Sequence, residues 1–120
     1  MPSPNLPTTA TTTHHHYMDK IAALSEILTA DPTNAFARYG LAMEHNTQGN
    51  SELALTEFTT LIHYNPDYVP AYQMSAQTLA KLGRTDEAVT RLKNGLDAAD
   101  RTKNTHAASE MQALLDDLTL

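Results

Sequence analysis

The residues of this 120-residue sequence with the most direct chemical potential are its six histidines. Three of them, His14, His15 and His16, are adjacent, and imidazole is a common ligand of transition metals. Adjacent side chains on a flexible chain lack the fixed geometry and the supporting hydrogen bonds of a metal site. We therefore expect a solvated tail or an expression remnant at this position, and no metal.

The other histidines do not form a catalytic arrangement. His45 falls on the expected core side of a helix, and neither His63 nor His106 has an Asp or Ser at a helical spacing that would build a triad. The sequence has no HExxH motif, no phosphate-binding glycine loop and no dinucleotide fingerprint. It also has no cysteine, which excludes a thiolate nucleophile, an iron–sulfur cluster and a sulfur-ligated zinc. We expect no catalytic residue, no cofactor and no enzyme activity.

The charge of the chain limits its partners. Eight Lys and Arg against fourteen Asp and Glu give a net charge of -6, which disfavours binding to a phosphate backbone. The longest apolar run, 39–43, is far shorter than the roughly 20 residues that cross a membrane. The first seventeen residues lack the apolar core of a secretory signal. We expect a cytoplasmic protein that binds neither nucleic acid nor a membrane.

One segment differs from the rest in charge. Residues 81–103 carry six bases and four acids, whereas residues 1–80 carry two bases and seven acids. The acids and bases of 81–103 alternate, which favours a solvated helix face with local ion pairs. Contact of this segment with an acidic partner is the alternative.

The elements that would position any site follow from a repeat of 34 residues. Pro32 and Pro66 are separated by this distance, and so are Gly49 and Gly83. Three segments also carry apolar residues at the i, i+3, i+7 spacing of a buried helix face. These are Ile21, Leu24 and Leu28, then Leu55, Phe58 and Ile62, then Val89, Leu92 and Leu96. Each unit therefore predicts two antiparallel helices, the first ended by the glycine and the second by the proline.

These units resemble the tetratricopeptide repeat (TPR) family. The matching residues are Leu41, Ala42, Gly49, Ala54, Phe58 and Pro66 in the first full unit, and Tyr72, Ala76, Gly83, Ala88 and Leu92 in the second. Two departures stand out, since Arg38 occupies the place of a usual large aromatic residue and Gly95 that of a usual alanine. The resemblance covers roughly 19–100 and implies an all-α superhelix of helical hairpins.

The pattern also predicts the limits of the domain. We expect a disordered tail over 1–17 and a single TPR-like domain over 18–118, made of a half repeat 19–32, repeats 35–68 and 69–102, and a capping helix 104–118. After Asp100 the apolar positions leave the 34-residue register, so the last helix has its own phase. Such a helix would cover the open end of the array.

The resemblance implies where a partner binds, because the first helices of TPR units line a concave side that receives peptides or partner helices. The corresponding residues here are Phe36, Tyr39, Met43, Asn46, Gln73, Gln77 and Lys81. An apolar and Met-containing patch beside amides suits a peptide that is held by apolar anchors and hydrogen bonds. The alternative is that some of Phe36, Tyr39 and Met43 pack against the leading helix or the cap. Tyr39 and Met43 also stand where the family's clamp for chaperone C-termini has Lys and Asn, so we do not expect that cochaperone activity.

A second function remains open, which is a homo-oligomeric scaffold. The leading helix would carry Ile21, Leu24, Ile27 and Leu28 with no upstream helix to cover them. Short repeat arrays with incompletely covered ends stabilise themselves by pairing. The sequence thus predicts a protein-interaction module that binds an unidentified protein or peptide, with a homodimer through the leading helix as the alternative.

Overall fold

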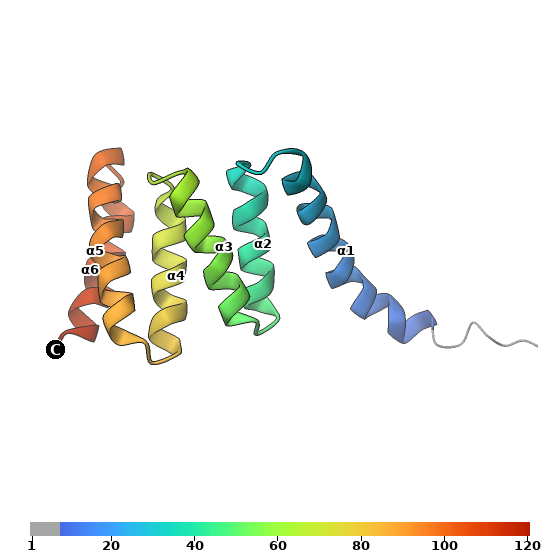
Figure 1. Ribbon diagram of the computed structural model, residues 1–120. Coiled ribbons are helices and arrows are strands. Elements are labelled where there is room, and N and C mark those ends of the chain that lie inside the picture. The colour runs from blue at the N-terminus through green and yellow to red at the C-terminus, as the bar shows by residue number, and fades with distance from the viewer. Residues whose placement is uncertain (1–7) are drawn as a thin grey trace, which may run out of the picture.

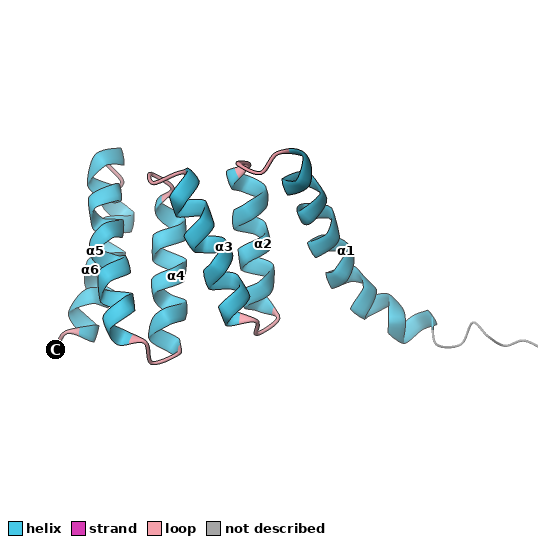
Figure 2. Ribbon diagram, in the orientation of Figure 1, coloured by secondary structure: helices cyan, strands magenta, loops and turns pink. Residues whose placement is uncertain are grey.

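The computed structural model describes the backbone of residues 8–120 and the side chains of residues 19–120. All regular structure in this part of the chain is helical (Figure 2). The helices are α1 (Thr8–Ala30), α2 (Ala35–Thr47), α3 (Ser51–Tyr64), α4 (Val69–Lys81), α5 (Thr85–Thr102) and α6 (Thr105–Leu118). The expected all-α class is confirmed.

The helices are antiparallel to their neighbours and form a row that follows the chain (Figure 1). The closest packing joins α2 to α3 and α4 to α5, and α3 to α4 links the two pairs. At one end α1 packs on α2, and at the other α6 packs on α5 and also reaches α4. This is the expected TPR-like array, with α2 and α4 as the first helices of the two full units and α6 after them.

Helix α1 begins earlier in the chain than the amphipathic pattern. Residues 1–7 lie outside the described residues, but 8–17, which we expected to be disordered, form the first turns of α1. The last proline before α1 is Pro7, so every residue of Thr8–Ala30 has a backbone N–H. Adding turns to an existing helix costs less than nucleating one, which accounts for the extension.

Small residues allow the paired helices to approach closely. Ala42, Ala54, Ala76 and Ala88 have no exposed surface, and Ala42 lies with Ala54 in one apolar cluster between α2, α3 and α4. Alanine at such positions keeps the two backbones close because no larger side chain separates them. Of the nine residues of the predicted apolar faces, four are buried and five are half-buried; the buried ones are Leu28, Leu55, Phe58 and Leu92.

The loops after α2 and α4 have the left-handed residue that the glycines predict. Gly49 has φ of 81° and Gly83 of 78°. After α5 the same place is taken by Lys103 with φ of 59°, and the Asn104 N–H then donates to the Ala99 carbonyl at 2.8 Å. A left-handed lysine costs free energy that glycine avoids.

Arg38 makes the same kind of hydrogen bond as Tyr72, the aromatic residue at the equivalent position of the next unit. Its Nη2 donates to the Pro32 carbonyl at 2.8 Å, as the Tyr72 hydroxyl donates to the Pro66 carbonyl at 2.7 Å one unit later. Arg38 also forms an ion pair of 2.6 Å with Glu57. Both side chains thus fasten the loop before their own helix.

Helix α6 closes the array through the buried Ala107 and Met111. Close approach depends on Gly95 of α5, because a Cβ there would lie 2.7 Å from both the Met111 sulfur and the Tyr72 Cβ. The family usually has alanine at this position, but here the Met111 side chain of α6 occupies the place that the alanine methyl group would need.

Candidate functional site

The first helices α2 and α4 and the last helix α6 are linked by side-chain hydrogen bonds. Asn46 Nδ2 of α2 donates to Thr78 Oγ1 of α4 at 3.0 Å. Gln73 Nε2 of α4 donates to Glu110 Oε1 of α6 at 2.8 Å. We use the name first-helix face for the surface formed by the residues that the sequence singled out. They are Phe36, Tyr39, Met43, Asn46, Gln73, Gln77 and Lys81.

Phe36 is the most accessible apolar side chain of this face. It lies in the first turn of α2, and 79% of its surface is exposed. Gln77 and Lys81 of α4 are exposed as well. A large aromatic side chain left in water is a strong anchor for a partner because burying it removes much apolar area from solvent.

Tyr39 and Met43 are partly used by the fold. The Tyr39 ring centre lies 6.0 Å from that of Phe58 and 5.5 Å from that of Tyr68, and burial raises the pKa of its hydroxyl. Met43 packs on the same cluster between α2, α3 and α4. Both side chains thus pack within the two full units. Each leaves part of its surface accessible at the edge of the face.

Two of the three amides of the face are hydrogen-bonded within the protein. Asn46 donates one N–H to Thr78, and Gln73 donates one N–H to Glu110. An amide group has a second N–H and a carbonyl oxygen that can still bond to a peptide backbone. These two side chains are therefore held in position for a partner rather than free to rotate.

The described side chains offer no metal centre, since among residues 19–120 no three His, Cys, Asp or Glu side chains lie together. His14, His15 and His16 lie in the part of α1 whose side chains are not described. His45 has a buried Nδ1 without a hydrogen-bond partner in the described chain. Within the described part of the chain, no helix is both long enough and apolar enough to span a membrane.

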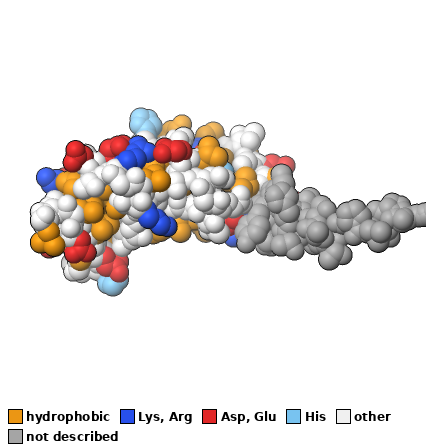
Figure 3. Space-filling view, turned by 90° about the horizontal axis from the view of Figure 1, so that it is seen from below, with side chains coloured by type: hydrophobic (Ala, Val, Ile, Leu, Met, Phe, Trp, Pro, Cys, Tyr) orange, Lys and Arg blue, Asp and Glu red, His pale blue; other side chains and the backbone are white. Residues whose placement is uncertain are grey.

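Sequence reasoning missed one feature on the other side of the array. A cavity of about 410 Å³ lies between α3 and α5, the second helices of the two full units. Its lining includes Arg84 and Arg91, two bases of the segment 81–103 that we interpreted mainly as a solvated face. The alternative interpretation of this segment, contact with an acidic partner, is the one that agrees with a basic cavity lining. Figure 3 shows acidic and basic side chains beside one another, so no large single-sign patch marks the surface in this view.

The chain matches the family model of the tetratricopeptide repeat over residues 45–115. It therefore belongs to the tetratricopeptide repeat family. It is 32% identical over 99 residues to the Tetratricopeptide repeat and J domain-containing co-chaperone DNJ1 of Cryptococcus neoformans. That match covers 82% of this chain but 18% of the co-chaperone, so the chain spans about a fifth of the length of this relative.

Solved structures agree with this assignment. A tetratricopeptide repeat domain protein from Salinibacter ruber, solved by NMR, has a TM-score of 0.70 and 32% identity, over 74% of this chain and 90% of that one. The type III secretion chaperone SycD of Yersinia enterocolitica, in complex with a peptide of the translocator YopD, has a TM-score of 0.78 at 15% identity. It covers 98% of this chain and 94% of its own. The second likeness concerns the fold alone.

Proposed function

We propose that this protein is a peptide-binding module that holds an extended segment or a helix of a partner protein on the first-helix face. The observation that carries the proposal is the 79% exposure of Phe36 at the start of α2. The likeness to a secretion chaperone that is solved with a bound peptide supports it. The cytoplasmic location and the residues of the face remain part of the proposal.

The chemistry of the face favours an anchor of apolar type. Phe36 and the accessible edges of Tyr39 and Met43 would bury an apolar side chain of the partner, and a thioether adapts its shape to different partners. Gln73 and Gln77 would bond to the partner backbone, as amides can both donate and accept. Lys81 alone would add little affinity for a carboxylate of the partner, because an exposed ion pair contributes little free energy.

The test uses peptides selected on the protein itself. A library of random twelve-residue peptides is selected against the full chain, and the affinity of the best peptide is measured by fluorescence anisotropy. Phe36→Ala should weaken binding at least tenfold, which is the loss of about 1.4 kcal/mol expected for an aromatic anchor. The matched control is Leu53→Ala, which removes a 53% exposed side chain from α3 and should leave the affinity unchanged. Equal binding by both variants and the wild type would overturn the assignment to this face.

Self-association through α1 is the second candidate function. Its support is that α1 packs chiefly on α2 and leaves Ile27 with 42% exposure. Leu24 is a poor test residue because its methyl groups lie 3.4 Å from the Cβ position of Gly40, so it is part of the packing of α1 on α2. Mass by light scattering should show a dimer that Ile27→Lys dissociates without loss of helicity. A monomer at every concentration would exclude this candidate.

A further inference from the structure

The cavity between α3 and α5 combines an apolar floor with polar walls. Leu55 and Leu79 form part of its lining and are themselves more than nine-tenths buried. Thr59, Thr90 and Asn94 supply hydroxyl and amide groups beside them. Its volume of about 410 Å³ falls within the range of roughly 300–1,000 Å³ that is usual for ligand sites. The second helices α3 and α5 form most of the lining, α4 adds Leu79, and no residue of the first-helix face takes part.

Arg91 brings a half-buried positive charge into this cavity. Its Nη1 donates to Ser75 Oγ at 3.1 Å and its Nη2 to Thr59 Oγ1 at 3.3 Å, and both acceptors are neutral hydroxyls. A guanidinium has five N–H groups, so these bonds leave three for another acceptor. No carboxylate of residues 19–120 forms an ion pair with Arg91. Burial lowers the pKa of Arg91, because the charged form loses hydration, and the Coulombic effects of Tyr72 and Glu87 offset this only in part.

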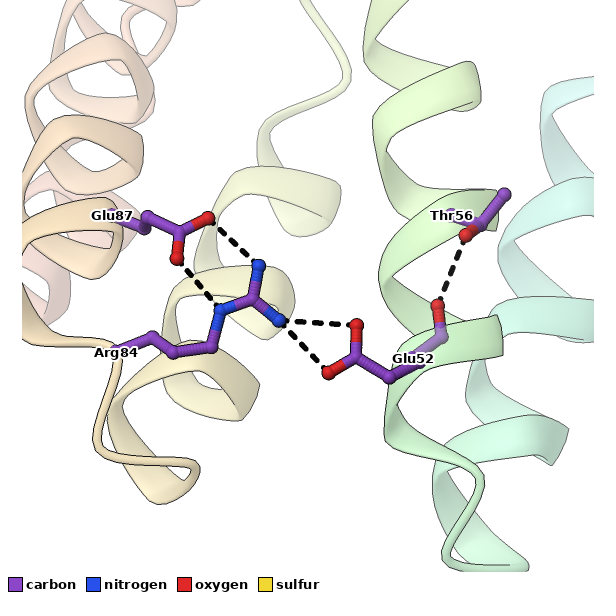
Figure 4. A network of polar contacts seen from close by, with 4 residues as sticks. All are labelled: Glu52, Thr56, Arg84 and Glu87. Atoms are coloured by element: carbon purple, nitrogen blue, oxygen red, sulfur yellow. Dashed lines mark hydrogen bonds and ion pairs between the residues drawn. The ribbon is translucent and has the colours of Figure 1, made fainter.

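Glu87, the acid whose charge acts on Arg91, is hydrogen-bonded to another arginine. Glu87 lies one helical turn before Arg91 on α5, a spacing at which a carboxylate and a guanidinium normally pair. Both of its carboxylate oxygens instead accept from Arg84, at 2.7 Å from Nε and 2.8 Å from Nη2 (Figure 4). The remaining Nη1 of Arg84 bonds to both oxygens of Glu52 on α3, at 3.1 and 2.9 Å. Arg84 thus binds Glu87 of the cavity lining and Glu52 beside it, while Asp86 is the second acid of the lining.

From this geometry we propose that the cavity binds the C-terminal residue of a partner protein, with its carboxylate on Arg91 and its apolar side chain on Leu55 and Leu79. A C-terminal residue is the protein group that carries an apolar side chain and a carboxylate on the same carbon. An Asp or Glu side chain would offer the charge without the apolar part. A phosphate dianion is disfavoured because Asp86 and Glu87 also line the cavity and repel a double charge more than a single one.

The test is an NMR titration of the isotope-labelled full chain with N-acetyl-leucine, which has the proposed carboxylate and side chain. Two further probes are N-acetyl-leucinamide, which lacks the charge, and inorganic phosphate, which lacks the apolar group. N-acetyl-leucine should give saturable shifts confined to Thr59, Leu79, Arg91 and Asn94, with at least tenfold weaker binding of the other two. Shifts of equal size with the amide, tighter binding of phosphate, or shifts scattered over the protein would overturn the proposal.

Variants separate the role of Arg91 from a general effect on the fold. Arg91→Lys keeps the charge but loses the planar fork, and we expect at least a fivefold weaker binding of N-acetyl-leucine. The control is Arg101→Gln on the same helix, whose partner is Asp67 and which should leave the affinity unchanged. Unchanged affinity in Arg91→Lys and in Arg91→Gln would refute the site.

The role of Arg84 has its own pair of variants. Arg84→Gln should release Glu87 to pair with Arg91, and the affinity for N-acetyl-leucine should fall at least threefold. The double variant Arg84→Gln with Glu87→Gln removes the competing acid, so the affinity should return to that of the wild type. If the double variant stays as weak as the single one, Arg84 does not act by holding Glu87, and the proposed arrangement is overturned.

Discussion

The close approach of α5, α4 and α6 at Gly95 gives a stability prediction with an internal control. Gly95 and Gly40 both lie inside helices, and replacing a helical glycine with alanine normally stabilises a protein by about 1 kcal/mol. At Gly40 the new methyl group would lie 3.4 Å from the Leu24 methyls, which is an ordinary contact. We therefore expect Gly40→Ala to stabilise the protein by about 0.5–1 kcal/mol.

At Gly95 the same substitution should have the opposite sign. The methyl group would lie 2.7 Å from the Tyr72 Cβ, whereas carbon atoms normally approach to about 3.5–4.0 Å. Tyr72 cannot yield easily, because its Cβ is fixed to α4 and its hydroxyl bonds to Pro66 at 2.7 Å. Overpacking costs about 1–3 kcal/mol, and the rigid neighbour places this site near the upper value. Subtracting the helical gain of about 1 kcal/mol leaves a net destabilisation of about 2 kcal/mol.

The assay is urea unfolding followed by circular dichroism, with the thermal midpoint as a second measure. Gly95→Ala should lower the midpoint by about 8–16 °C and Gly40→Ala should raise it by a few degrees. If Gly95→Ala is as stable as the wild type, or if the two variants shift in the same direction, the reasoning from the 2.7 Å contact is refuted.

Three further predictions concern the loops and the ion pairs. Lys103→Gly should stabilise the protein by about 1 kcal/mol in urea unfolding, because glycine adopts the φ of 59° without a steric penalty. Asn34→Ala should cost about 1 kcal/mol in the same assay, since Asn34 Oδ1 accepts from the Ala37 N–H at the start of α2. Arg84 lowers the pKa of the Glu87 carboxyl below its ordinary value of 4.5, so this pair contributes stability above that pH that is lost as the pH falls through the lower folded value. The urea midpoint of Glu87→Gln should accordingly fall less between about pH 5 and pH 3 than that of the wild type, and an equal fall would contradict the pairing.

The sequence predicts the helical array well because its repeat places each type of residue where the geometry requires it. Gly49 and Gly83 mark turns that need positive φ, and Ala42 and Ala54 mark a close approach of two helices. Such local requirements allow few residue types, so the residue type identifies the position. Lys103 shows the limit of this reasoning, since the same turn forms there without the glycine.

The candidate site is less predictable because exposure depends on tertiary contacts. Phe36 and Tyr39 are both aromatic residues on the expected face, yet the first is exposed and the second packs between Phe58 and Tyr68. The pattern of charges likewise marks Arg91 as a surface base. Its partners Thr59 and Ser75 lie 32 and 16 residues away in the chain, and no local pattern relates residues at those distances.

The row of helices has a consequence for how the chain folds. The longest sequence separation of a side-chain hydrogen bond within residues 19–120 is 37, between Gln73 and Glu110. Proteins whose contacts are this local close only short loops on the way to the native state, and helical examples fold within microseconds to milliseconds. Each hairpin can therefore form as soon as its two helices exist, so α2 with α3 can be complete during synthesis before α6 has been made.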